Sequence, residues 1–251
     1  MAIFKQTTRC ILLLVVVLSS CGSYKNIPYY QDLNHDIITE ETVSNFSPLT
    51  IHAGDILGIN VTSRNPESSA KFNTGSSQEN AVEGYLVDDK GEIQLPYLGM
   101  VKVTGLTTAQ LRDTLSGLLL TFYKNPVVNI RLLNFKVAVS GDVQRPDVYR
   151  LQNERTTITQ ILSLAGDLNI TAMRKNVILI REENGKRSFI PIDLTSKKIF
   201  DSPYYYLKNN DEIYVQPDRT KYATVDRGYR TASLILSGLS VIAIVLSTLY
   251  R

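Results

Sequence analysis

Residues 85–111 read YLVDDKGEIQLPYLGMVKVTGLTTAQL, and this stretch decides the fold class. Its first part, residues 88–91 (DDKG), predicts a hairpin turn with glycine at the left-handed position. The turn would join a strand at residues 85–87 to a returning strand at residues 92–95. The stretch contains no pattern typical of a nucleophile, a metal site or a phosphate-binding loop, so we interpret it as scaffold.

The second part of the stretch predicts a strand and then a helix. Pro96 ends the returning strand because it cannot donate a backbone hydrogen bond. Residues 100–103 are expected to form another strand, and Thr107 with Gln110 forms a capping box that begins a helix. One face of this helix would carry Leu111, Leu115, Leu118, Leu119 and Phe122. A continuous buried strand is expected at residues 127–133.

The residues before the stretch complete a first α+β domain. Residues 49–51 and 56–62 alternate apolar and polar side chains and predict two strands. Residues 53–55 (AGD) form the turn between them. A Ser/Asn/Gly-rich loop follows up to about residue 80, and a loop of that length is usually functional or mobile.

Together these segments resemble a known family. Residues 49–67 (LTIHAGDILGINVTSRNPE), followed by residues 84–111, are similar to the periplasmic domain of the outer-membrane polysaccharide export proteins. The Asp-x-x-Gly turn, the Leu-Pro corner and the Gly-Leu-Thr helix start all match in order and spacing. The family opens its domain on Pro-Gly-Asp, where this chain has Ala53-Gly54-Asp55.

Residues 135–217 predict a second small domain. Thr157 and Gln160 form another capping box, and Gly166 ends the helix that follows. The buried face of this helix is expected to carry Ile158, Ile161, Leu162 and Ala165. Strands on both sides of the helix predict a β-grasp-like module, which resembles the soluble-ligand-binding β-grasp (SLBB) domain of the same family.

Three consecutive tyrosines stand out in the second domain. Tyr204, Tyr205 and Tyr206 are candidate saccharide contacts, because aromatic rings stack on sugars. Tyrosines also pack in cores and interfaces with their hydroxyl groups at a polar edge, and we favour that interpretation.

The N-terminus has the pattern of a lipoprotein signal. Lys5 and Arg9 precede an apolar run at residues 11–18, which is too short to span a bilayer but is typical of a secretory signal. The sequence Leu18-Ser19-Ser20-Cys21-Gly22 then resembles a bacterial lipobox, in which Cys21 would be lipidated and become the new N-terminus. An ordinary signal peptide followed by a chance cysteine is the alternative.

The residues after Cys21 bear on the destination of the protein. Gly22 is not the aspartate that retains lipoproteins in the inner membrane, and residues 23–26 lack the acidic cluster of a Bacteroidetes surface-export signal. The resemblance to a Bacteroidetes-like lipoprotein member therefore implies the inner leaflet of the outer membrane, with the domains in the periplasm. Residues 24–48 are polar and irregular and predict a linker.

The C-terminus predicts a transmembrane helix. Residues 232–250 contain no charged side chain, and 19 residues of helix rise about 28 Å, close to the thickness of a bilayer core. One helical face carries the small hydroxyl side chains of Ser233, Ser237, Ser240 and Ser247. Such a stripe suits close helix packing or the lining of a pore, and spacing alone does not separate the two.

Composition argues against several classes of function. The formal net charge of +3 gives no reason to expect nucleic-acid binding. His35 and His52 lack the spacing of metal ligands, so no metal or cofactor is expected. No Ser/His/acid set or phosphate loop is present, and Asp88 and Asp89 are better explained as turn residues than as an acid/base pair, so we expect no enzyme.

We therefore predict an α+β protein with two small periplasmic domains and a C-terminal transmembrane helix. The expected segments are a signal peptide at 1–20, a linker at 21–48, an export domain at 49–134, a β-grasp domain at 135–217, a second linker at 218–230 and the helix at 231–251.

The resemblance implies a homo-oligomeric ring that exports capsular or extracellular polysaccharide across the outer membrane. It also implies an inner-membrane polysaccharide co-polymerase, often coupled to a tyrosine kinase, as partner. The alternative is a membrane-tethered saccharide-binding or adaptor lipoprotein without a pore.

Overall fold

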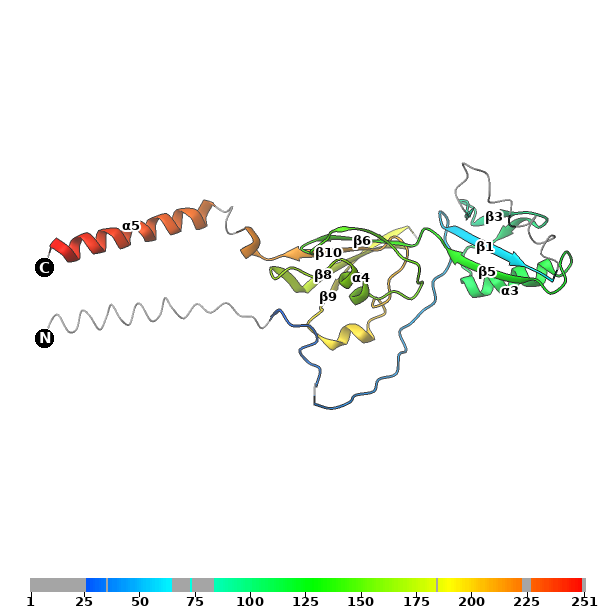
Figure 1. Ribbon diagram of the computed structural model, residues 1–251, viewed down its shortest axis with the longest axis horizontal. Coiled ribbons are helices and arrows are strands. Elements are labelled where there is room, and N and C mark those ends of the chain that lie inside the picture. Colours follow the sequence, from blue (N-terminus) through cyan, green and yellow to red (C-terminus); the bar gives the residue numbers. More distant parts are fainter. Residues whose placement is uncertain are drawn as a thin grey trace.

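The computed structural model describes residues 26–34, 36–64, 73, 84–183, 185–222 and 227–249. Two units that combine strands and helices follow one another, and helix α5 extends from the second unit (Figure 1). Two separate clusters of buried apolar side chains confirm two domains of the α+β class.

The first domain is built around strand β1, which lies between two antiparallel neighbours in the order β2-β1-β5. A separate ribbon of β3 and β4 and the helix α3 share one apolar cluster with the sheet. The elements are β1 (Ile56–Thr62), β2 (Tyr85–Leu86), β3 (Glu92–Leu95), β4 (Gly99–Lys102), α3 (Thr108–Leu119) and β5 (Val127–Leu132).

The turn at residues 88–91 is present, but the strand pairing predicted around it is wrong. The Asp88 amide donates to the Glu92 carbonyl at 2.9 Å, while the Asp88 carboxylate accepts from the Glu92 amide at 2.8 Å. Beyond the turn, however, β2 pairs with β1 and β3 pairs with β4. The carbonyl of Gly91 accepts from Val103 and Thr104, so the turn also receives the chain that leaves β4.

Two further predictions for the first domain need correction. The expected strand at residues 49–51 forms only an isolated bridge between Thr50 and Thr107. The Ile51 amide donates a hydrogen bond to the Leu106 carbonyl, in the loop before α3. Strand β5 is not continuously buried, since its side chains alternate between exposed and covered positions. It is an edge strand of a sheet whose apolar cluster lies on one face, which produces this alternation.

Helix α3 begins as predicted and buries a narrower face than predicted. Both halves of the Thr107–Gln110 capping box form, and Leu111, Leu115 and Leu119 are fully buried. Leu118 and Phe122 remain 45% and 49% exposed. A spacing of four residues keeps the three leucines on one stripe, whereas Leu118 lies one residue outside it.

The second domain is a five-stranded sheet in the order β7-β6-β10-β8-β9, in which only β6 and β10 are parallel. The second capping box also forms, and the predicted apolar face of α4 is buried. The elements are β6 (Lys136–Gly141), β7 (Asp147–Arg150), α4 (Ile158–Leu164), β8 (Ala172–Glu183), β9 (Lys186–Ile192), η3 (Lys197–Asp201), β10 (Glu212–Pro217) and η4 (Arg219–Tyr222).

The described part of the predicted linker lies against the second domain before the chain enters the first. The Tyr30 amide donates to the Leu194 carbonyl at 3.3 Å, and Asp32 accepts at 2.6 Å from the Lys197 amide at the start of η3. Farther along, the Asn45 side chain donates to the carbonyls of Phe200 and Ser202. We call the described residues 26–34 and 36–48 the strap, because they run past the second domain toward the first (Figure 1).

Candidate functional site

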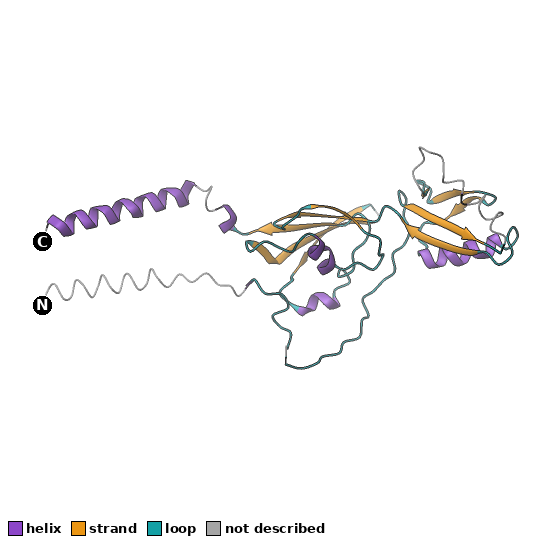
Figure 2. Ribbon diagram, viewed as in Figure 1, coloured by secondary structure: helices purple, strands orange, loops and turns teal. Residues whose placement is uncertain are grey.

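Helix α5 (Arg227–Leu249) is the most unusual surface of the described chain. Its segment Thr231–Leu249 has a mean hydropathy of 2.2, and none of it is buried within the protein. Figure 2 shows this helix apart from both sheets. By length and composition it can cross a membrane, and an exposed apolar surface of this size is typical of a membrane or assembly contact.

The serine stripe of α5 is less polar than the sequence suggests. The hydroxyl of Ser237 donates to the Ser233 carbonyl at 2.9 Å, and that of Ser240 donates to the Ser237 carbonyl at 2.7 Å. Ser247 bonds the Ile244 carbonyl in the same way. Each of these donors is satisfied within its own helix, so the stripe is compatible with a neighbouring helix as well as with water.

A buried carboxylate holds η4 (Arg219–Tyr222), which we call the connector because it follows the last strand of the second domain and precedes α5 in the chain. Asp142 is fully buried and accepts from Lys221 Nζ at 2.6 Å, Thr171 Oγ1 at 2.6 Å and Asn169 Nδ2 at 2.9 Å. Burial alone would raise the pKa of Asp142, but the hydrogen bonds from Lys221, Thr171 and Asn169 outweigh it and hold the pKa below its ordinary value. Lys221 lies in η4, so this contact ties the connector to the domain.

Acid should loosen this contact. Because the pKa of Asp142 is lower in the folded protein, its contribution to stability is present above the ordinary aspartate value and is lost as the pH falls below about 4. We expect the urea midpoint of the second domain to fall between pH 5 and pH 3. In Lys221→Met the midpoint should be lower at pH 7 and should depend less on pH. Equal pH profiles for both proteins would contradict this assignment.

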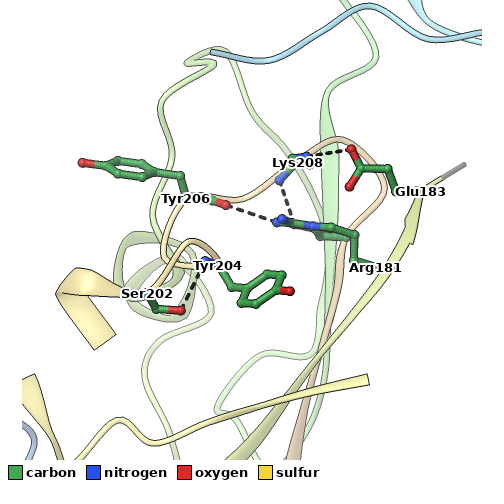
Figure 3. Close-up of polar contacts among 7 residues, drawn as sticks. Arg181, Glu183, Ser202, Tyr204, Tyr206 and Lys208 are labelled. Atoms are coloured by element: carbon green, nitrogen blue, oxygen red, sulfur yellow. Dashed lines mark hydrogen bonds and ion pairs between the residues drawn. The ribbon is translucent and has the colours of Figure 1, made fainter. Parts of the chain in front are cut away.

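The three tyrosines are all engaged within the protein. The Arg181 guanidinium lies 5.6 Å from the Tyr204 ring centroid and donates to the Tyr206 carbonyl at 3.1 Å (Figure 3). The Tyr205 ring packs edge-on against Phe200. These contacts favour the structural interpretation of the cluster, and its role as a saccharide contact stays a prediction.

Tyr206 also joins the strap to the second domain. Its ring meets Phe46 edge-on at 5.0 Å between centroids, and the guanidinium of Arg155 lies 4.6 Å from the Phe46 ring and 5.2 Å from the Tyr206 ring. The same guanidinium donates to the Tyr206 hydroxyl at 2.9 Å. A cation next to two aromatic faces is a stabilising arrangement, so the strap is held by more than main-chain hydrogen bonds.

Behind the tyrosines lies a buried ion pair that sequence reasoning missed. Arg181 donates from Nε and Nη2 to the two carboxylate oxygens of Asp211, at 2.8 and 2.6 Å, and the two side chains are only 6% and 1% exposed. Asp211 also accepts from the Lys208 amide at 2.7 Å. No sequence pattern predicts the pair. Arg181 follows an apolar run that predicts a buried strand, and Asp211 lies in a segment that predicts a turn.

The two domains meet through polar contacts. Asn209 donates to the buried carboxylate of Asp55 at 2.8 Å, and Thr108 donates to Glu154 at 3.1 Å. A cavity of about 320 Å³ lies at this junction, and its lining includes His52. The turn at Ala53-Gly54-Asp55 therefore contributes a domain contact as well as a turn.

The other candidate site residues either serve a turn or lie outside the described part of the chain. Within the described ranges, no group of three His, Cys, Asp or Glu side chains could hold a metal ion. Asp88 serves the turn through its bond to Glu92. Cys21 and His35 lie outside the described residues, so lipidation of Cys21 remains a prediction.

Comparison with known proteins identifies both domains. The polysaccharide biosynthesis/export protein family matches residues 44–133, and the SLBB domain matches residues 136–191. The chain is 27% identical over 195 residues to the EPS I polysaccharide export outer membrane protein EpsA of Ralstonia solanacearum, covering 72% of this chain and 51% of that protein. The corresponding protein of Ralstonia nicotianae is 29% identical over 183 residues, which cover 68% of this chain and 48% of that protein.

A third relative is the capsule polysaccharide export outer membrane protein CtrA of Neisseria meningitidis serogroup A. It is 27% identical over 144 residues, covering 51% of this chain and 37% of CtrA. The chain thus spans about half the length, or less, of the curated relatives it matches. The export family model matches the first structural domain, and the SLBB model matches the β6–β9 part of the second, so the chain carries an export domain of the polysaccharide biosynthesis/export protein family followed by an SLBB domain.

Proposed function

We propose that this protein is the lipoprotein subunit of an oligomeric channel that exports capsular or extracellular polysaccharide across the outer membrane. The observation that carries the proposal is helix α5, which exposes an uncharged apolar surface at Thr231–Leu249 beside two domains of an export family. The relatives named above are polysaccharide export proteins of the outer membrane, which supports the same substrate and location here.

A channel requires several copies of the chain. One helix encloses nothing, so the α5 helices of several subunits would have to form a ring. The small side chains of Ser233, Ser237 and Ser240 permit close approach of neighbouring helices. In this arrangement a lipid on Cys21 supplies a second anchor, the domains lie in the periplasm, and an inner-membrane co-polymerase with its tyrosine kinase is the partner.

One observation favours the alternative, a membrane-tethered saccharide-binding or adaptor protein without a pore. The hydroxyls of Ser237, Ser240 and Ser247 are satisfied within α5, so the helix does not need water or a partner along that stripe. A lone helix of this kind would be stable in lipid as a simple anchor.

The mass and shape of the detergent-purified particle separate the two functions. We expect a ring of several copies with an axial opening, measured by light scattering and electron microscopy. Ser240→Leu should lower the ring fraction because a larger side chain holds the helices apart, while Ser240→Ala should preserve the ring. A wild-type protein that is monomeric in mild detergent would contradict the channel and support the adaptor.

A further inference from the structure

A groove of about 610 Å³ opens on the second domain. Its walls come from the end of β7, from the loop that follows and from α4. The lining residues are Arg150, Leu151, Gln152, Asn153, Thr156, Thr159, Gln160, Ser163 and Leu164. The volume lies in the range of about 300–1,000 Å³ that is typical of small-molecule sites.

A capping box and an Asx turn fix the direction of two amide side chains in this groove. The Gln160 side-chain oxygen accepts from the Thr157 amide at 2.9 Å, as the capping box requires. The Asn153 side-chain oxygen accepts from the Arg155 amide at 3.0 Å. Because both oxygens are occupied by backbone donors, the NH₂ groups of Gln160 and Asn153 are left as donors, and no described residue accepts from either.

The other lining side chains supply one cation and no negatively charged acceptor. Arg150 forms no ion pair or side-chain hydrogen bond with any described residue. The hydroxyls of Thr156 and Ser163 donate to main-chain carbonyls at 2.8 and 2.9 Å. No carboxylate is among the lining residues, so the groove presents one positive charge and several unused N–H donors.

We propose that this groove binds carboxylate-bearing sugar residues, such as uronic acids, of the exported polysaccharide. The inference rests on the proposed export function and specifies its substrate class. A uronic acid offers one carboxylate for Arg150 and several neutral oxygens for the NH₂ groups of Asn153 and Gln160. An acidic peptide also offers carboxylates to Arg150, but it lacks the ring and hydroxyl oxygens that a sugar presents to the NH₂ groups of Asn153 and Gln160.

The test is calorimetric binding to the detergent-purified full-length protein. The probe is hexagalacturonate, and the neutral comparison is maltohexaose. Arg150→Gln removes the cation. Gln160→Glu preserves the capping box, since glutamate at this position also accepts from the Thr157 amide, but replaces the free NH₂ group by a carboxylate oxygen.

We expect each variant to bind hexagalacturonate at least about tenfold more weakly than wild type, because each loses a charge-assisted or donor contact. The matched control is Lys186→Gln, which removes an exposed cation from β9, at the opposite edge of the sheet from Arg150 on β7. It should bind as wild type does. Wild type should also prefer hexagalacturonate over maltohexaose.

Three outcomes would overturn the proposal: no binding of hexagalacturonate by wild type, unchanged affinity in both groove variants, or tighter binding of hexaglutamate than of hexagalacturonate. The last would assign the groove to an acidic peptide. Failure here is distinct from failure of the export function, which is tested by particle mass and surface polysaccharide without added ligand. A ring that exports polymer but ignores hexagalacturonate would contradict only the groove assignment.

Discussion

Replacing Asp211 with alanine is expected to lower the free energy of unfolding of the second domain by about 3–5 kcal/mol. The substitution leaves the guanidinium of Arg181 buried without its counter-ion, since Arg181 is 6% exposed and both of its carboxylate contacts go to Asp211. It also removes the acceptor of the Lys208 amide. The loss should exceed the net contribution of the pair, because an unpaired buried charge carries most of the cost.

Urea unfolding of the full-length protein, followed by near-ultraviolet circular dichroism of tyrosine, measures this loss. The chain has no tryptophan, and Tyr204 and Tyr206 both contact Arg181 directly. Glu182→Ala is the matched control, because it breaks the exposed pair with Arg187 in the neighbouring strand and should cost less than about 1 kcal/mol.

The double variant Arg181→Met/Asp211→Ala should recover part of the loss, since it removes the unpaired charge. A loss below 1 kcal/mol for Asp211→Ala alone would show that water reaches Arg181 and that the pair is not a core element.

Local signals in the sequence were sufficient for the helices of both domains. The capping boxes at Thr107 and Thr157 need only residues three apart, and both formed as predicted. The Asp88–Gly91 turn is equally local and is present. Hairpin rules predict that β2 pairs with β3, which is wrong. The actual partner of β2 is β1, whose side chains lie more than 25 positions away and are not included in such rules.

Contacts of long sequence separation were not predictable from the chain. The strap reads as an irregular polar linker, yet Asp32 caps η3 and Phe46 meets Tyr206, both more than 150 residues later. The ion pair between Arg181 and Asp211 also joins two segments that are separate in the sequence, 30 residues apart, so local patterns do not predict it. Single-sequence patterns report burial and turns, and these contacts depend on which surfaces meet after folding.

The strap and the connector suggest how the two expected anchors relate. Residues 26–34 and η4 lie at the same end of the second domain, opposite the first domain (Figure 1). Asp32 ties the strap there through Lys197, and Asp142 ties the connector through Lys221. Cys21 precedes the strap by only five residues, so a lipid at Cys21 and helix α5 would reach one membrane from the same end of the molecule.

Deletion of residues 232–251 is therefore expected to abolish polysaccharide export while both domains stay folded. Helix α5 contributes no residue to either apolar core, so its removal should leave the urea midpoints of both domains within experimental error. Surface polysaccharide should fall to the level of a strain that lacks the gene, measured by extraction and by staining of whole cells.

Cys21→Ala is the matched comparison for this deletion, because it removes the other expected anchor and retains the helix. It should abolish labelling by radioactive palmitate and lower surface polysaccharide less than the deletion does, since α5 alone can hold the protein in a bilayer. The deletion should instead leave a palmitate-labelled protein at the membrane that exports nothing. Normal surface polysaccharide in the deletion strain would contradict the channel, because a conduit without its membrane-crossing segment cannot open the outer membrane to a polymer.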